Sequence, residues 1–305
     1  MFRPLVQPRP AERGRVWPVP RGDEAVCGIE PLTTSEGPAW GGPALGPKFL
    51  RRTLLLAGLA TASLPAMARI RDLGEAINKA GAQRMLSQRM TKAWLALALP
   101  DIEGRAHKIL EASQQRFDSQ LAELRAFAPT AEIASTYEQL GQRAAVLKGR
   151  LDELPVTPAR VNAVIPLAGE VLKLAHQGTG LLEKRSEAAS AKLINLAGRQ
   201  RMLSQRLAML YLAEEHGVDR ALIRTEMGVA RNDFRAAMRV LQSAPETSAE
   251  IHQNLQLAAS QWIFLDAALG GTSHGQRAAA EAFLASENLL AVMETVTGQY
   301  ARLLG

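Results

Sequence analysis

The chain has 305 residues, of which 47% are hydrophobic and 22% charged, so it is long enough for about two domains and apolar enough for a packed soluble core. The formal net charge of +6 is small for this length, and part of it lies before residue 69, which argues against nucleic acid as a partner. The only cysteine is Cys27, so neither a disulfide within the chain nor thiol chemistry is expected.

The first part of the sequence resembles an export signal rather than a folded domain. Residues 1–47 are rich in Pro, Gly and Arg and lack periodicity, which predicts a disordered extension or a start codon assigned too early. Residues 48–68, KFLRRTLLLAGLATASLPAMA, combine an Arg-Arg pair, a short apolar run and a final small-x-small site, as in twin-arginine signal peptides. We expect a periplasmic protein cleaved after Ala68; the alternative is an inner-membrane anchor formed by residues 50–67.

From residue 69 onward, Ala, Leu, Gln, Glu and Arg dominate, a composition that favours helix over sheet. Helices are predicted over residues 70–98, 101–127, 131–153, 158–185, 187–216, 219–242, 248–269 and 274–303. Their ends are indicated by Pro129-Thr130, Thr157-Pro158, Gly217 and two capping boxes, Thr247-x-x-Glu250 and Ser273-x-x-Gln276.

A thirteen-residue motif occurs twice, as INKAGAQRMLSQR at 77–89 and INLAGRQRMLSQR at 194–206, and the copies differ only at their third and sixth positions. The offset between the copies is 117, and the segment that starts at Gly169 precedes the one that starts at Ser286 by the same offset. The predicted fold is therefore all-α, with two tandem up-down four-helix bundles over residues 69–185 and 186–305.

Each motif helix carries a second stripe opposite its core-facing stripe, with the alternating steps of four and three that are typical of a coiled-coil seam. The stripe consists of Ile77, Gly81, Arg84, Gln88, Thr91 and Leu95 in the first copy and of Ile194, Gly198, Arg201, Gln205, Ala208 and Leu212 in the second. An interior glycine lowers helix stability by about 0.5–1 kcal/mol relative to alanine, which is tolerated where another backbone or a ligand comes close. An arginine in such a seam requires an anionic partner.

Two interpretations of this seam remain open. In the first, Arg84 and Arg201 grip a small oxyanion with their planar guanidinium groups, while Gly81 and Gly198 permit the close approach. In the second, the arginines pair with Glu or Asp within the bundles and the glycines only ease helix packing.

The two motifs resemble the signature helix of the NarX-like sensor domain, also called the PilJ domain. This resemblance implies a periplasmic four-helix bundle, as in nitrate/nitrite sensor kinases and in type IV pili methyl-accepting chemotaxis transducers. It also implies nitrate binding by one arginine from each of two motif helices, here Arg84 and Arg201, with Gln88 and Gln205 as further ligand contacts. Because kinase and methyl-accepting segments are not found in this sequence, the resemblance indicates a sensor module that reports to a separate membrane chemoreceptor or kinase.

Enzyme chemistry is not indicated. The five histidines do not pair at ligand spacing, Glu103, His107 and Glu111 are better explained as a solvated helix face than as a metal site, and Ser87 and Ser204 have no nearby histidine base. We expect no cofactor and no metal. The leading hypothesis is a small-oxyanion binding protein for nitrate or nitrite, and the alternative is a helical scaffold that binds only a protein partner.

The stretch between the two repeats, Glu183 to Leu193, contains no Gly or Pro and predicts a continuous helix. The bundles would then stack end to end, with Arg84 and Arg201 about 40 Å apart. Each motif would need a mate on a second chain, which predicts a homodimer. A fold-back at residues 186–190 would instead place Arg84 opposite Arg201 within one chain.

Overall fold

The computed structural model describes residues 69–271 and 275–304, and every regular element in these residues is a helix. The elements are α1 (Leu73–Leu95), the 3-10 turn η1 (Ala96–Ala98), α2 (Glu103–Phe127), α3 (Ala131–Leu151), α4 (Pro158–Glu183), α5 (Ala189–Glu215), α6 (Arg220–Ser243), α7 (Ala249–Gly270) and α8 (Gln276–Ala301). The all-α prediction is confirmed, and the predicted bounds agree with these to within a few residues.

Local capping explains several of the helix ends. The side chains of Thr130 and Thr157 accept hydrogen bonds from backbone N–H groups in the first turns of α3 and α4, as predicted for N-cap residues. Gly217 has a φ of 86° and follows the C-cap of α5, where the left-handed conformation ends the helix.

The expected capping box at Thr247 is wrong by one residue. Ser248 caps α7 by accepting from the backbone N–H of Ile251, whereas the Thr247 hydroxyl donates to the carbonyl of Leu241 at 2.7 Å. Thr247 therefore ties the end of α6 to this turn. The second expected box begins at Ser273, which lies outside the described residues.

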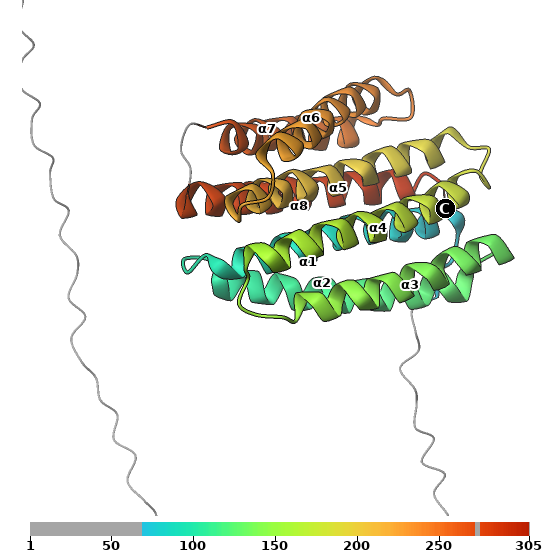
Figure 1. Cartoon of the computed structure of the whole chain (residues 1–305). Coiled ribbons are helices and arrows are strands. Elements are labelled where there is room, and N and C mark those ends of the chain that lie inside the picture. The colour runs from blue at the N-terminus through green and yellow to red at the C-terminus, as the bar shows by residue number, and fades with distance from the viewer. Residues whose placement is uncertain (1–68, 272–274, 305) are drawn as a thin grey trace, which may run out of the picture. The chain divides into compact units, whose positions relative to one another are not determined.

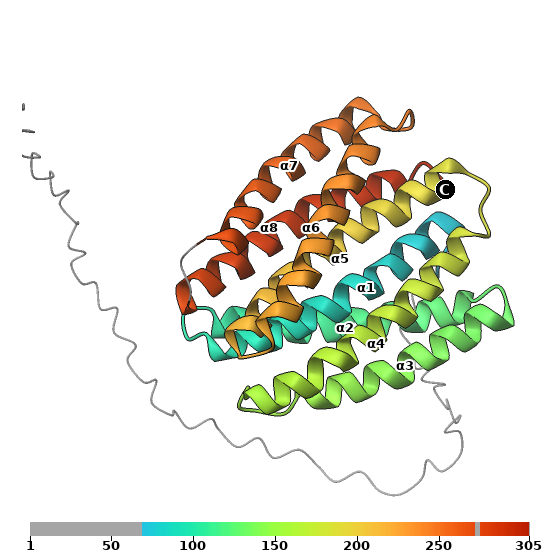
Figure 2. The same cartoon turned by 45° about the horizontal axis from the view of Figure 1, so that its top comes forward.

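The helices form two up-down four-helix bundles that lie side by side, α1–α4 in one and α5–α8 in the other (Figures 1 and 2). They stack in pairs, in the order α2 with α3, α1 with α4, α5 with α8 and α6 with α7. The two motif helices, α1 and α5, are thus in contact at the centre, and each repeat packs its own second, third and fourth helices outside that pair.

Helices α1 and α5 run parallel and in register. The Arg84 guanidinium donates to the carbonyl of Asn195 in the first third of α5, and His216, just beyond α5, contacts the carbonyl of Leu95 at the end of α1. The whole predicted stripe is buried in both helices. The seam that the sequence predicted for an outside partner is therefore the contact between the two repeats.

The predicted continuous helix between the repeats, and with it the end-to-end rod, is wrong. Helix α4 ends at Glu183 and α5 begins at Ala189. The backbone N–H groups of Arg185 and Ser186 form short-range turn bonds, and the Ser186 hydroxyl accepts from the N–H of Ala188. Good helix formers alone do not keep a helix straight, because burial of the apolar seam residues against the other repeat outweighs propensities of a few tenths of a kcal/mol.

Candidate functional site: the arginine pair between the repeats

The two motif helices come close together at their motif glycines. A Cβ atom added to Gly81 would lie 3.3 Å from the Nη2 atoms of both Arg84 and Arg201 and 3.8 Å from the Cα of Gly198. A Cβ on Gly198 would meet the same two guanidinium groups, at 3.3 and 3.4 Å. The glycines therefore leave the space in which two buried cations face each other, as the first interpretation of the seam requires.

Each arginine reaches across the seam to the opposite repeat. The Nη2 of Arg84 donates to the carbonyl of Asn195 at 3.2 Å, and the Nη2 of Arg201 donates to the carbonyl of Asn78 at 3.1 Å. Both side chains are 1% exposed, and the Nε of each has no hydrogen-bond partner among the described residues. The pair thus has an approximate two-fold relation, and each guanidinium retains an unused donor.

The motif glutamines define how the outer helices correspond. The Nε2 of Gln88 donates to the carbonyl of Ala168 on α4, and the Nε2 of Gln205 donates to that of Ser286 on α8. Ala168 is therefore the counterpart of Ser286. The separation between these two residues is one more than the offset of 117 between the motifs. The correspondence expected from the sequence, Gly169 with Ser286, is wrong by this one residue.

In the corrected register, the counterpart of His176 is Glu294, and this difference breaks the two-fold relation. The carboxylate of Glu294 accepts from the Nη1 of Arg201 at 2.9 Å and also pairs with Arg116 at 3.1 Å. The Nη1 of Arg84 instead lies 3.3 Å from the Nδ1 of His176. Among the described residues, Arg84 forms no ion pair, so the second interpretation of the seam holds for Arg201 but not for Arg84.

The electrostatics follow from this asymmetry. Burial, together with the like charges of Arg201 and Arg199, lowers the pKa of Arg84 to about 9. Burial and the Arg84 charge also lower the pKa of His176, which keeps its imidazole neutral at pH 7. Burial raises the pKa of the Glu294 carboxyl, but its two arginine neighbours outweigh burial and lower it. The Glu183 charge acts in the opposite direction on Arg84 and His176 but does not outweigh burial. Of the two paired arginines, only Arg201 therefore has a carboxylate in direct contact, and it shares that carboxylate with Arg116.

The glutamines predicted as ligand contacts are engaged within the protein. Besides the bonds to α4 and α8, each amide Nε2 contacts the preceding serine hydroxyl of its motif. The Oε1 of Gln88 accepts from Arg206, and the Oε1 of Gln205 accepts from Lys92. The structure therefore uses Gln88 and Gln205 to hold each motif helix to its neighbours, and the oxyanion hypothesis now rests on the arginines and glycines.

A buried ionic cluster of Arg89, Lys92 and Glu287 joins the two repeats. The Nζ of Lys92, whose side chain is 0% exposed, donates to Gln205, Ser286 and Glu287 at 2.7, 2.8 and 2.7 Å. Arg89 forms a two-pronged contact with the same Glu287 carboxylate. The counterparts of Lys92 and Glu287 in the other repeat are Met209 and Gly169. These residues were not predicted from the sequence. The available signal was that the first motif helix has a lysine, Lys92, at the position where the second motif helix has a methionine, Met209.

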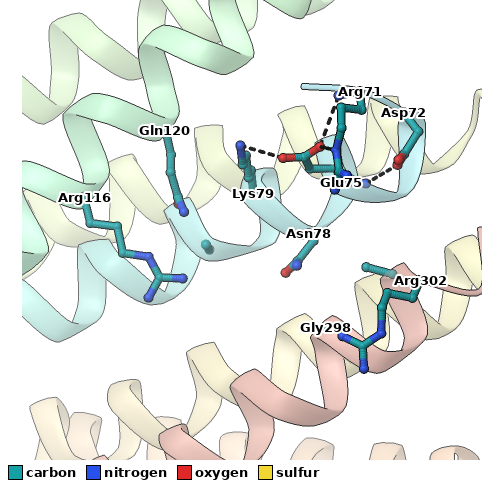
Figure 3. A pocket seen from close by; sticks show the side chains of 11 residues that line it. Arg71, Asp72, Glu75, Asn78, Lys79, Arg116, Gln120, Gly298 and Arg302 are labelled. Atoms are coloured by element: carbon teal, nitrogen blue, oxygen red, sulfur yellow. Dashed lines mark hydrogen bonds and ion pairs between the residues drawn. The ribbon is translucent and has the colours of Figure 1, made fainter. Parts of the chain in front are cut away.

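Clefts lie on both sides of the central helix pair. The first, of about 600 Å³, is polar and lies between the start of α1, α2 and the end of α8. Figure 3 shows that Glu75, one of its two carboxylates, lies between Arg71 and Lys79, so the Glu75 charge is already paired. The second, of about 460 Å³, lies between α4, α5 and α6 and is lined by Arg84 and His176. Only the second cleft has one of the paired arginines in its lining.

Two further properties concern the described residues alone. None of their helices is both long and apolar enough to cross a membrane. They contain no group of three or more His, Cys, Asp and Glu side chains that could hold a metal ion, and Glu103, His107 and Glu111 are exposed on α2.

These features define a class of protein: a tandem helical bundle whose repeated motif helices meet inside one chain around a pair of buried arginines. The sequence model of the PilJ family, described as the type IV pili methyl-accepting chemotaxis transducer N-terminal domain, matches residues 66–165 and 184–292. The chain belongs to this family, and membership indicates a sensory domain in chemotaxis-type signal transduction. No curated protein and no solved structure matches the chain.

Proposed function

We propose that the protein is an exported, non-catalytic sensor module that binds a small oxyanion, nitrate or nitrite first, between Arg84 and Arg201. The observation that carries the proposal is the pair of buried guanidinium groups that face each other over Gly81 and Gly198, of which only Arg201 has a carboxylate, Glu294, in direct contact. A monovalent anion would give Arg84 the anionic contact that it lacks, and a planar oxyanion matches the donor geometry of guanidinium groups.

The internal pairing changes the expected stoichiometry. The homodimer was predicted because the arginines of one chain were expected to lie far apart, and the side-by-side bundles remove that reason. One chain contains both arginines, so we propose one oxyanion site per chain, whether or not chains associate. The module would report to a separate membrane chemoreceptor or kinase through its outer helices.

Isothermal titration of the full chain with nitrate and nitrite tests the proposal. Losing one charge-assisted hydrogen bond should weaken binding roughly 10- to 150-fold, so Arg84→Ala and Arg201→Ala should each abolish most binding. Arg277→Ala is the matched control, because its side chain is 93% exposed and it removes one positive charge elsewhere. Equal binding by the Arg84→Ala, Arg201→Ala double variant would refute the site.

The alternative is a helical scaffold without a small-molecule ligand, and the ion pair between Arg201 and Glu294 favours it. That alternative is supported if no oxyanion produces heat while a membrane receptor co-purifies with the chain. Export is tested separately: in the periplasmic fraction, the mature N-terminus should be Arg69, whereas intact chain in the inner membrane would indicate an anchor.

A further inference from the structure

The two sides of the arginine pair differ in the side chain that contacts the arginine. On one side, Arg201 is satisfied by the Glu294 carboxylate. On the other, the counterpart position holds His176, whose ring nitrogen lies 3.3 Å from the Nη1 of Arg84. A neutral imidazole does not compensate the charge of a buried guanidinium. The position next to Arg84 therefore lacks the carboxylate that its counterpart has.

The cleft of about 460 Å³ between α4, α5 and α6 leads to this position. Arg84 is buried at 1% exposure and its Nε is unpartnered among the described residues, whereas His176 is exposed at the cleft. Because solvent surrounds much of the imidazole, His176 can rotate away from Arg84 without disturbing the helix core.

The rest of the lining contains three further cations, Lys173, Arg199 and Arg206, and an apolar part. Arg199 pairs with Asp233 at 2.6 Å and Arg206 with Glu226 at 2.7 Å, so the two acidic residues of the cleft are already paired. The apolar part of the lining consists of Leu172, Met202, Leu203, Val229 and Ala230. A ligand that fits this environment carries one negative charge at one end and an apolar body at the other.

We propose that this cleft binds a small carboxylic acid with an apolar body, and that its carboxylate takes the place of His176 on Arg84. The bound carboxylate would reproduce, in trans, the contact that Glu294 makes with Arg201. This site shares Arg84 with the proposed oxyanion site but needs neither Arg201 nor the space between the glycines, so the two proposals can fail separately.

The test uses isothermal titration of the full chain with benzoate. Acetate is the comparison, because it has the same carboxylate but lacks the apolar ring. Benzoate should bind at one site per chain and more tightly than acetate. His176→Glu places a carboxylate beside Arg84 and should weaken benzoate binding at least about 10-fold, whereas His176→Ala should preserve or strengthen it. His176 is exposed, so both variants should fold.

A second variant fills the cleft. Gly169 lines the cleft on α4, and a Cβ added there meets no atom within 4 Å. Gly169→Leu should therefore fold, block benzoate and leave nitrate binding unchanged. Gly180→Leu is the matched control, because Gly180 lies on the same helix, has equally open surroundings and does not line the cleft.

The proposal is overturned if benzoate fails to bind the full chain, if it binds no better than acetate, or if His176→Glu and Gly169→Leu bind it as well as the unmodified chain does. If the unmodified chain binds benzoate but not nitrate, only the oxyanion site is refuted. Circular dichroism of each variant identifies any loss of folding.

Discussion

Replacement of Glu287 by glutamine should destabilise the contact between the repeats in a pH-dependent way. Burial raises the pKa of the Glu287 carboxyl, but the Lys92 charge and the Arg89 hydrogen bond outweigh burial and lower it to about 2, from an ordinary value of 4.5. A carboxyl with a lowered folded-state pKa stabilises the fold fully above pH 4.5, and that stabilisation is lost as the pH falls towards 2.

The magnitude follows from the shift. A difference of about two and a half pKa units corresponds to about 3 kcal/mol, which agrees with the known effect of removing one partner from a buried ion pair. Glu287→Gln should therefore lower the free energy of unfolding by about 3 kcal/mol at pH 7. Burial lowers the pKa of Lys92 to about 8 although the Glu287 charge raises it, so in the unmodified chain the ammonium is mostly charged from pH 7 downward.

The assay is urea denaturation of the full chain, followed by circular dichroism between pH 7 and pH 2. The difference between the unmodified chain and Glu287→Gln should shrink below pH 4.5 and become small near pH 2, where about half of the Glu287 carboxyls are protonated. Glu281→Gln is the control, because its partner Arg277 is 93% exposed and surface pairs of this kind stabilise little. A difference that stays constant from pH 7 to pH 2 would contradict the assigned role of Glu287.

Three further substitutions probe the packing of the helices. Gly81→Ala should weaken nitrate binding in titration, because its Cβ would lie 3.3 Å from two guanidinium groups and displace them. The unfolding free energy should change little, because alanine favours helix more than glycine does. Unchanged binding would contradict the close-approach argument. Gly178→Ala should lower the unfolding free energy by about 1–3 kcal/mol in urea, since its Cβ would lie 2.7 Å from the Tyr137 ring, and a neutral effect would show that the ring moves freely. Gln83→Met should raise the unfolding free energy by about 1–3 kcal/mol, because the 0% exposed Gln83 amide has no hydrogen-bond partner among the described residues. A lower unfolding free energy would indicate that the amide does form a stabilising hydrogen bond.

Much of the fold could be predicted because helices leave a local signature. The 3.6-residue period, together with caps such as Thr130 and Thr157, located the helices, and the spacing from Ile77 to Leu95 predicted a second buried stripe. These features depend on residues within a few positions of one another, so one sequence is sufficient to find them.

The relation between the repeats could not be predicted in the same way. The turn between Glu183 and Ala189 contains no helix breaker, and it forms because the two seams bury each other, which is a contact between residues about 117 positions apart. Local propensity and long-range burial favoured different structures here, and burial contributes more to the free energy of folding than propensity does.

The partners of the arginines were hidden for a related reason. At the offset of the motifs, His176 aligns with Met293, and neither residue suggests a partner for arginine. The one-residue shift that aligns it with Glu294 becomes visible only through the glutamine bonds to Ala168 and Ser286. A small change in loop length between repeats therefore concealed the residues that distinguish the two arginines.

Fusion of the two repeats in one chain permits a charge balance that two identical chains could not have. In a symmetric pair, both arginines would face the same residue: two glutamates would neutralise the pair and leave no attraction for an anion, and two histidines would leave two uncompensated buried cations. Here Glu294 contacts Arg201 and His176 contacts Arg84, so only one of the two arginines has a carboxylate in direct contact. His176→Glu should therefore abolish oxyanion binding by giving Arg84 a carboxylate of its own, whereas Glu294→His should lower stability in the absence of an anion and make it depend on nitrate concentration. Thermal unfolding of both variants with and without nitrate measures this, and equal nitrate responses in the two would contradict the proposed charge balance.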